Sequence, residues 1–229
     1  MKTLWLLGGM SYTSTSTYYD GINKWVNKVM GKLHSAPLLI HSFDFEHIEQ
    51  LQHKEEWITL SEELTHAAKN LESIWAQWII ICTNTMHLLA ENIQKNITIP
   101  IIHIADAVGK KLKNSQIQKV WLLGTRFTME KDFYRTNIEK YSIEVITPEK
   151  HEREEIHRII YDELCINTIN PDSRQVFLWI IENLRIRGAQ AIILWCTEIG
   201  LLVHPTDTPV PLYDSTEIHV EESIQFITG

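Results

Sequence analysis

Two short segments carry the side chains of this chain that are best suited to chemistry. They are Thr83-Asn84-Thr85 and Cys196-Thr197-Glu198, and each follows an Ile-rich apolar run. A cysteine thiolate removes protons readily, whereas a threonine hydroxyl is a poor base that can still deliver a proton or position a water. Acting on opposite faces of a small acid, the two groups suit exchange of an α-proton. Backbone donors around the substrate carboxylate would stabilise the carbanion.

An internal repeat links these two segments. Three apolar motifs of the first half recur in the same order in the second half: Trp5-Leu6-Leu7-Gly8 as Trp121-Leu122-Leu123-Gly124, Ala76-Gln77 as Ala189-Gln190, and, more loosely, Pro100-Ile101-Ile102 as Pro211-Leu212-Tyr213. Buried strands resemble one another because they are rich in Ile and Leu, but the shared Trp and Gln argue for a true repeat. Extending the second match places Thr83 opposite Cys196 and Cys82 opposite Trp195.

The elements that must position these residues follow from the hydrophobic pattern. Short apolar runs predict strands at residues 4–7, 37–42, 78–82, 99–102, 120–123, 143–146, 192–195 and 210–212. Longer amphipathic runs predict helices at about 15–30, 55–74, 150–165 and 173–187, with another opening after Asn84. Strands that alternate with helices predict an α/β fold with parallel sheets covered on both faces.

Together with the repeat, this pattern predicts two pseudo-symmetric, flavodoxin-like α/β lobes that face each other across a central cleft. The first lobe comprises residues 1–105 plus a C-terminal helix of about 214–229, and the second comprises 106–213. Ligands of open α/β sheets bind outside the carboxyl ends of the strands, where both segments fall. Free N–H groups of helix N-termini at these turns would bind a carboxylate and lower the pKa of Cys196.

Composition and motifs exclude several function classes. The net charge is −8 with no basic run, which argues against a nucleic-acid partner. The three dispersed cysteines form neither a disulfide framework nor a zinc motif, which favours a reducing, cytoplasmic setting. No run approaches the length of a membrane span, and the nucleotide-binding, His-x-x-His-type metal and Gly-x-Ser-x-Gly motifs are missing. We therefore expect no membrane association, cofactor or metal.

Three motifs together resemble the aspartate/glutamate racemase family over nearly the whole chain. They are Gly8-Gly9-Met10-Ser11, Cys82-Thr83-Asn84-Thr85-Met86-His87 and Cys196-Thr197-Glu198-Ile199. The resemblance implies a pyridoxal-free isomerase that is a homodimer and uses one acid–base residue from each half. Because Thr83 stands where two-cysteine members have cysteine, the chain is similar to the asymmetric Thr/Cys subgroup. That subgroup favours the L-enantiomers of aspartate or glutamate, and some of its members act more broadly.

The resemblance and the repeat together give each residue a role. Cys196 is expected to deprotonate one enantiomer while Thr83 delivers a proton from the other side. The rival assignment makes Cys82 the second thiol, but strand alternation points it away from its neighbour Thr83. The remaining substrate-binding candidates are Met10, Gln52, Asn84, Thr85, Thr125, Thr197 and Glu198. Of these, Glu198 is expected to pair with the substrate ammonium.

Several candidates also have a structural interpretation. Thr83 could be a helix N-cap, His87 a structural histidine, and Gln52 a surface residue that only the resemblance makes a candidate. Two departures from the family bear on the substrate. The loop of residues 41–45 lacks the arginine that clamps a distal carboxylate in two-cysteine members, and Cys165 stands where they carry a lysine.

Three alternative functions remain open at this point. A broad-specificity amino-acid racemase would use the same residues on other substrates. A cofactor-free decarboxylase of malonate-type acids would use Cys196 only to protonate an enolate. A non-catalytic binding protein for acidic amino acids would use the two lobes for recognition alone. Glu198 favours an amine-bearing substrate and hence a racemase over the decarboxylase.

Overall fold

The structure is a computed structural model that describes residues 1–228. The chain divides into two compact units. The first comprises Met1–His103 together with His219–Gly229, and the second comprises Ile104–Ile218. Each unit is built around its own parallel sheet, and the two sheets have the same strand order, β2-β1-β3-β4 and β6-β5-β7-β8. The predicted α/β fold and its internal repeat are therefore confirmed.

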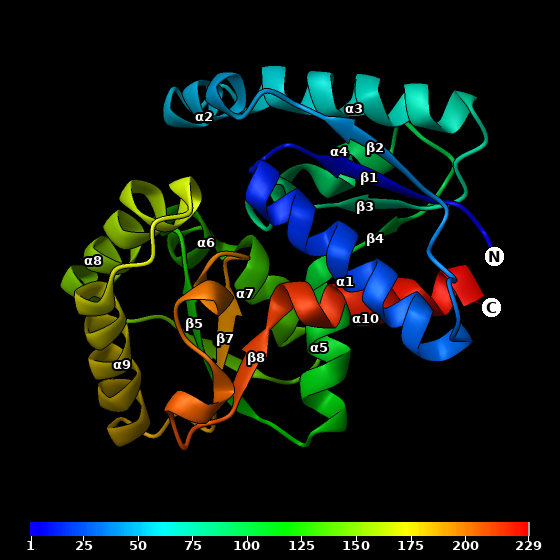
Figure 1. Ribbon diagram of the computed structural model, residues 1–229. Helices are drawn as coiled ribbons and strands as arrows, with labels where there is room; N and C mark the ends of the chain where they lie inside the picture. Colours follow the sequence, from blue (N-terminus) through cyan, green and yellow to red (C-terminus); the bar gives the residue numbers. More distant parts are fainter. Residues whose placement is uncertain (229) are drawn as a thin grey trace. The chain divides into compact units, whose positions relative to one another are not determined.

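The first unit follows the chain through alternating strands and helices (Figure 1). Its elements are β1 (Leu4–Gly8), α1 (Tyr12–Met30), β2 (Leu38–Ser42), α2 (Phe45–His53), α3 (Trp57–Ser73), β3 (Ile79–Ile81), the 3₁₀ helix η1 (Thr85–Leu89), α4 (Ala90–Gln94) and β4 (Ile101–Ile102). The last helix of the chain, α10 (Ser215–Thr228), belongs to this unit from His219 onward.

The second unit repeats this plan. Its elements are α5 (Ile104–Asn114), β5 (Lys119–Gly124), α6 (Arg126–Glu130), α7 (Asp132–Glu139), β6 (Glu144–Ile146), α8 (Lys150–Asp162), η2 (Leu164–Ile166), α9 (Pro171–Ile186), β7 (Ala191–Trp195), η3 (Ile199–Leu201), η4 (Pro205–Asp207) and β8 (Leu212–Asp214). The two central strands, β5 and β7, pair from Val120 beside Ala191 to Gly124 beside Trp195.

Strand alternation divides the core of the first unit into two apolar layers. In β1, Trp5 and Leu7 face the layer that α3 covers, whereas Leu4 and Leu6 face the layer that α1 and α10 cover. Figure 1 shows α2 and α3 along one face of this sheet and α1 along the other. Cys82 continues the alternation into the second layer, so that the following side chain, Thr83, is not directed into it.

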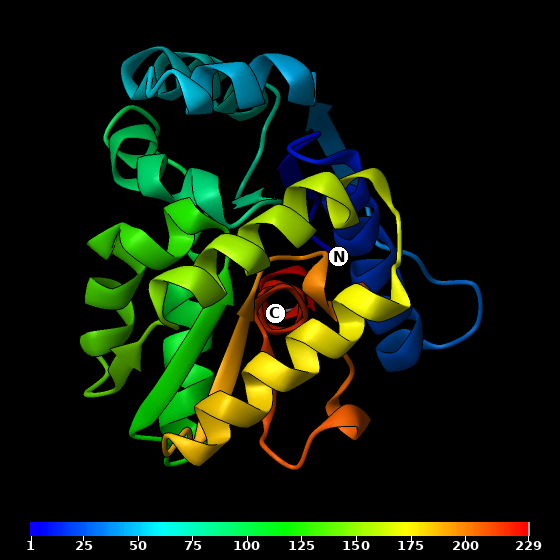
Figure 2. The same cartoon turned by 90° about the vertical axis from the view of Figure 1, so that its left-hand side faces the viewer.

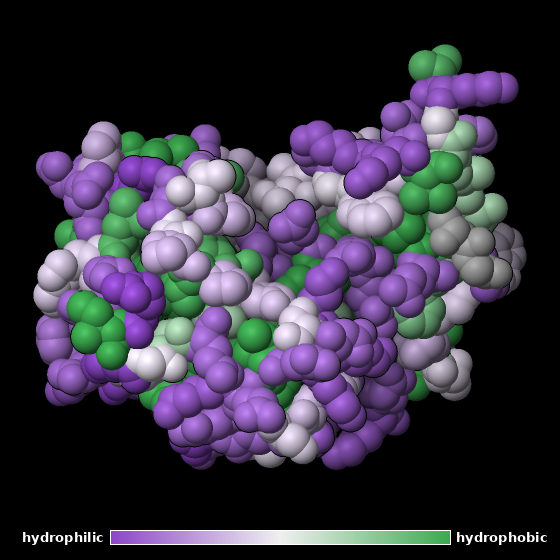
Figure 3. Space-filling model, turned by 90° about the horizontal axis from the view of Figure 1, so that it is seen from below, coloured by the Kyte–Doolittle hydropathy of each residue, from purple (hydrophilic) through white to green (hydrophobic). Residues whose placement is uncertain are grey.

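Helices also cover both faces of the second sheet. Figure 2 shows α8 and α9 running across one face of the sheet, and α5 and α7 supply buried residues to the same core cluster. Buried apolar side chains throughout β5 and β7 match the near-continuous hydrophobic runs expected of parallel strands covered on both sides. On the face drawn in Figure 3, hydrophilic residues surround small hydrophobic patches.

Several elements differ from the sequence predictions. The last strand occupies Leu212–Asp214 rather than 210–212, because Ile192 pairs with Leu212 in the register of the sheet. The helix expected after Asn84 begins as a 3₁₀ helix and becomes α-helical only at Ala90. Helix α2 was not predicted, although Asp44 caps its N-terminus by accepting a hydrogen bond from the Glu46 N–H.

The turn after β1 provides a test of this fold. Gly9 has a φ of +84°, and a Cβ there would meet the backbone of Phe43. Gly188 has a similar φ of +92°, but its Cβ would meet nothing within 4 Å. Gly9→Ala and Gly188→Ala are each expected to lose about 1–2 kcal/mol of folding stability, because alanine is strained at a positive φ. We expect Gly9→Ala to lose about 1–3 kcal/mol more, because the added methyl is overpacked. Urea unfolding of both variants measures the difference, and equal losses would contradict the close approach of Phe43.

Candidate functional site

Thr83 lies at the carboxyl end of β3 with a side chain that is available for chemistry. The residue is 9% exposed, and its hydroxyl has no hydrogen-bond partner among residues 1–228. The expected N-cap role is wrong, because the N-cap of η1 is Asn84 and no side chain caps that helix. The hydroxyl of Thr83 is therefore not used by the fold, which supports a role toward a ligand.

Cys82 has the opposite environment. It is fully buried in the layer between the sheet and α1, and burial raises the pKa of its thiol well above the ordinary value. The Ser14 hydroxyl donates a 2.6 Å hydrogen bond to its backbone carbonyl, which fixes the end of β3. This burial argues against Cys82 as the second acid–base residue, in agreement with strand alternation.

The other candidates of the first unit are buried. Asn84 and Thr85 follow Thr83 directly and are 5% and 7% exposed. Met10 is 3% exposed and packs into the apolar layer beneath α3. Gln52 is also only 3% exposed, so the interpretation of it as a surface residue is wrong. It lies one helical turn after the core residue Ile48 on α2, which turns its side chain to the same buried face.

In the second unit, Cys196, Thr197 and Glu198 form one compact hydrogen-bonded group after β7. The Cys196 thiol donates a hydrogen bond to the Glu198 carboxylate, with 3.0 Å between Sγ and Oε2. The Thr197 hydroxyl donates to the same oxygen at 2.5 Å. The Glu198 carboxylate therefore accepts hydrogen bonds from the two residues that precede it. Its expected pairing with a substrate ammonium stays a prediction.

Electrostatics at Cys196 differ from the expectation. Burial raises the pKa of the thiol well above its ordinary value, and the neighbouring Glu198 carboxylate raises it further. The expected lowering by a helix N-terminus is wrong, because the turn leads only into the three-residue 3₁₀ helix Ile199–Leu201. Cys196 is therefore a thiol at neutral pH, already bonded to a group that can accept its proton.

This arrangement predicts how removing the charge of Glu198 changes the reactivity of the Cys196 thiol. Replacing Glu198 with glutamine removes a negative charge that raises the pKa of Cys196, so the thiolate forms at lower pH. We expect the pH midpoint of Cys196 alkylation by iodoacetamide to fall in Glu198→Gln, as followed by peptide mass spectrometry. The same substitution at Glu182, an exposed residue paired with Arg185, is the control and should leave the midpoint unchanged. An unchanged or higher midpoint in Glu198→Gln would contradict the electrostatic coupling.

Thr125 follows β5, the strand beside β7, and is 7% exposed. It caps α6 by accepting a hydrogen bond from the Thr128 N–H, and the two hydroxyls lie 2.9 Å apart. Because Gly124 pairs with Trp195 in the sheet, Thr125 and Cys196 follow directly from paired positions. The register thus brings Thr125 beside the cysteine turn.

Two further residues, Cys165 and Trp195, lie near Cys196. Cys165, on η2, is half-buried, and its pKa is raised first by burial and then by Glu198, which places it near the same carboxylate. Trp195 is fully buried, and its ring stacks edge-on against Tyr134 with centroids 4.6 Å apart. Trp195 therefore belongs to the packing behind the site.

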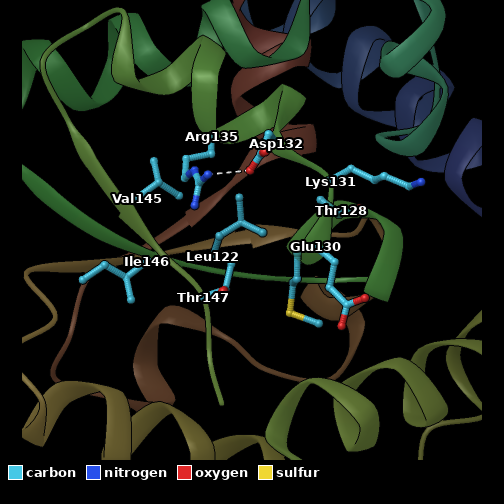
Figure 4. Close-up of a pocket in the computed structure, with 10 residues that line it drawn as sticks. Leu122, Thr128, Glu130, Lys131, Asp132, Arg135, Val145, Ile146 and Thr147 are labelled. Carbon is cyan, nitrogen blue, oxygen red and sulfur yellow. Dashed lines mark hydrogen bonds and ion pairs between the residues drawn. The ribbon is translucent and has the colours of Figure 1, made fainter. Parts of the chain in front are cut away.

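A separate pocket of about 220 Å³ lies in the second unit (Figure 4). Its lining residues are Leu122, Thr128, Met129, Glu130, Lys131, Asp132, Arg135, Val145, Ile146 and Thr147. Figure 4 shows the Arg135 guanidinium above Leu122 and paired with Asp132. None of the candidate site residues is among the lining residues, so this pocket is distinct from the Cys196 turn.

Within residues 1–228, no group of three His, Cys, Asp or Glu side chains is arranged to hold a metal ion. In the same part of the chain, no helix has the length and apolar character needed to cross a membrane.

Comparison with known proteins identifies the family and supports the fold. The model of the Asp/Glu/Hydantoin racemase family matches residues 7–223. A broad specificity amino-acid racemase from Bacillus subtilis, RacX, is 24% identical over 92% of both chains. A crystal structure from Yersinia pestis, described as that of a candidate Asp/Glu racemase, is 45% identical with a TM-score of 0.93. An aspartate racemase homologue from Pyrococcus horikoshii is 33% identical with a TM-score of 0.88. Each covers 100% of both chains.

Proposed function

This chain belongs to the Asp/Glu/Hydantoin racemase family and is an amino-acid racemase, and we propose that it racemises acidic amino acids without a cofactor by means of Cys196 and Thr83. The observation that carries the proposal is the 3.0 Å hydrogen bond from the Cys196 thiol to Glu198 at the carboxyl end of β7. A free, protonated thiol is a weak base, but one bonded to a carboxylate has a local acceptor for its proton.

The first step converts the thiol into a base. The Cys196 proton passes to Glu198, and the resulting thiolate takes the α-proton of the L-amino acid. The electron pair of the broken C–H bond moves into the substrate carboxylate, which gains charge as an enediolate. Backbone N–H groups at the Thr83 and Cys196 turns are suited to stabilise that charge. Glu198 is neutral after this step, so the site does not accumulate two negative charges, and Glu198 releases its proton to solvent before the next turnover.

The second step returns a proton to the opposite face of the α-carbon. We assign this step to the Thr83 hydroxyl, which has no partner within the described residues. The threonine alkoxide is inaccessible near neutral pH, so Thr83 must be reprotonated from solvent or a bound water as it donates. Starting from the D-enantiomer, the same hydroxyl would have to act as a base. Turnover of saturating D-substrate is therefore slower, while kcat/KM is the same in the two directions because the equilibrium gives equal amounts of both enantiomers.

The substrate range depends on which residues are available to bind a distal carboxylate. The expected arginine clamp for a distal carboxylate is missing from the loop of residues 41–45, and Gln52 is buried on the helix that follows. A neutral amide recognises a carboxylate less selectively than a guanidinium does. Together with the similarity to RacX, this favours broad specificity as the second candidate function. No observation favours the decarboxylase or the binding protein, because the chain belongs to the racemase family.

Chiral chromatography tests the proposal and separates the two candidates. The purified protein is incubated with L-aspartate, L-glutamate, L-alanine or L-lysine without added pyridoxal phosphate, and the D-enantiomer is quantified. D-aspartate or D-glutamate as the fastest product supports the acidic assignment. Faster formation of a neutral or basic D-amino acid would move the assignment to a broad-specificity racemase. No D-product from any amino acid would overturn the proposed function.

A further inference from the structure

His87 lies directly beneath the Thr83 turn and is 2% exposed. Its Nδ1 is 2.9 Å from the Thr83 carbonyl oxygen. A carbonyl only accepts hydrogen bonds, so Nδ1 carries the proton and donates. The imidazole therefore connects η1 back to the end of β3, four residues earlier, by a bond that an apolar side chain could not make.

The surroundings keep His87 in this neutral, donating form. Its ring packs edge-on against His103 and His219, with centroids 4.9 and 5.4 Å away. Burial lowers the pKa of His87 well below its ordinary value, and these two imidazoles lower it further. His219 is fixed in turn, with Nε2 donating to the Ile102 carbonyl and Nδ1 accepting from the Tyr18 hydroxyl. Burial also lowers the pKa of His219 to about 3, so His219 carries no charge at neutral pH.

Holding the Thr83 carbonyl has a consequence for the next N–H group. The carbonyl of Thr83 and the N–H of Asn84 belong to one planar trans peptide, in which they point in opposite directions. While the carbonyl is directed at His87, the Asn84 N–H is directed away from it. Without a donor at position 87, rotation of this peptide would replace the N–H with a carbonyl oxygen. An oxygen there would repel a carboxylate and the enediolate formed from it.

We propose that His87 is a positioning residue that sets the orientation of the Thr83–Asn84 peptide, so that the Asn84 N–H donates to the substrate carboxylate. This inference rests on the proposed racemase function and adds a residue that the reaction itself does not touch. The effect on rate is expected to exceed the effect on binding, because the carboxylate gains charge in the transition state. Losing one donor of this kind lowers kcat by about 10²–10³-fold.

Two substitutions of His87 separate positioning from packing. His87→Leu keeps a comparable volume but removes the donor, so we expect kcat/KM to fall by about 10²-fold, mostly through kcat. His87→Asn places an amide N–H near the position of Nδ1, so we expect kcat/KM within a few-fold of the wild type. Tyr18→Phe removes a bond within the cluster without touching Thr83, and is expected to leave kcat/KM unchanged. Thermal unfolding of each variant measures the loss of stability separately from the change in kcat/KM.

The outcomes distinguish this inference from the proposed function. A wild-type protein that exchanges no α-proton would overturn the racemase assignment itself. An active wild type with a folded His87→Leu variant of unchanged kcat/KM would overturn only the positioning role, as would equal losses in His87→Leu and His87→Asn. Should His87→Leu not fold, His87→Met provides the donor-free variant. A 10²-fold loss in a stable His87→Asn variant would also contradict the proposal.

Discussion

Replacing Cys196 with alanine lowers the rate of racemisation by about 10³-fold, within the range that one positioned acid–base group contributes. The loss is expected from both enantiomers, because Cys196 is the base for one direction and the acid for the other. Chiral chromatography of the product measures both rates. The lost hydrogen bond between the Cys196 thiol and the Glu198 carboxylate is buried, so thermal unfolding of the variant measures its cost in stability separately from the change in rate.

Cys82→Ala is the matched control for that experiment. Cys82 is fully buried in the core, and its thiol makes no hydrogen bond among the described residues. We expect its removal to cost stability through the small cavity that it leaves, while the rate stays within a few-fold of the wild type. A large rate loss in Cys82→Ala with full activity in Cys196→Ala would reverse the assignment of the catalytic thiol.

Replacing Thr83 with alanine separates proton exchange from racemisation. In D₂O, Cys196 of this variant still removes the α-proton of the L-amino acid, and it returns a deuteron to the same face. We therefore expect deuterium incorporation into the L-enantiomer to continue, while formation of the D-enantiomer falls by about 10²-fold. NMR measures loss of the α-proton, and chiral chromatography of the same samples measures inversion.

Thr83→Ser is the control for this variant because it keeps the hydroxyl and removes one methyl group. It is expected to retain inversion within about tenfold of the wild type, in contrast to Thr83→Ala. If Thr83→Ala loses exchange and inversion in equal measure, Thr83 acts in binding or in the turn rather than as the second acid. If it loses neither, another group supplies the proton.

The positions of the two candidate turns could be predicted from the sequence because they follow from local patterns. The shared Trp5 and Trp121 motifs mark the central strand of each sheet, and both sheets have the strand order that the repeat requires. Alternation along β3 also predicts that Cys82 and Thr83 have different environments, as the structure bears out. Such features depend on periodicities of two and 3.6 residues, which the sequence displays directly.

The electrostatics of Cys196 could not be predicted in the same way. A strand-to-helix turn suggested a thiolate, but the thiol is buried and bonded to Glu198, and both effects raise its pKa. Burial of Gln52 was missed because helix α2 was not predicted. The sequence does contain a signal for this helix, because the N-cap residue Asp44 precedes Ile48 and Leu51 at helical spacing. A helix of nine residues shows too few periodic positions to be distinguished from a loop.

The most direct test of the central claim is α-proton NMR of the wild-type protein in D₂O with each enantiomer of aspartate and glutamate, without added cofactor. The mechanism predicts loss of the α-proton signal from the L-forms, slower loss from the D-forms at saturating concentration, and no loss in Cys196→Ala. Absence of exchange with all four substrates would contradict the assignment to acidic amino acids. Undiminished exchange in Cys196→Ala would contradict the role of the cysteine.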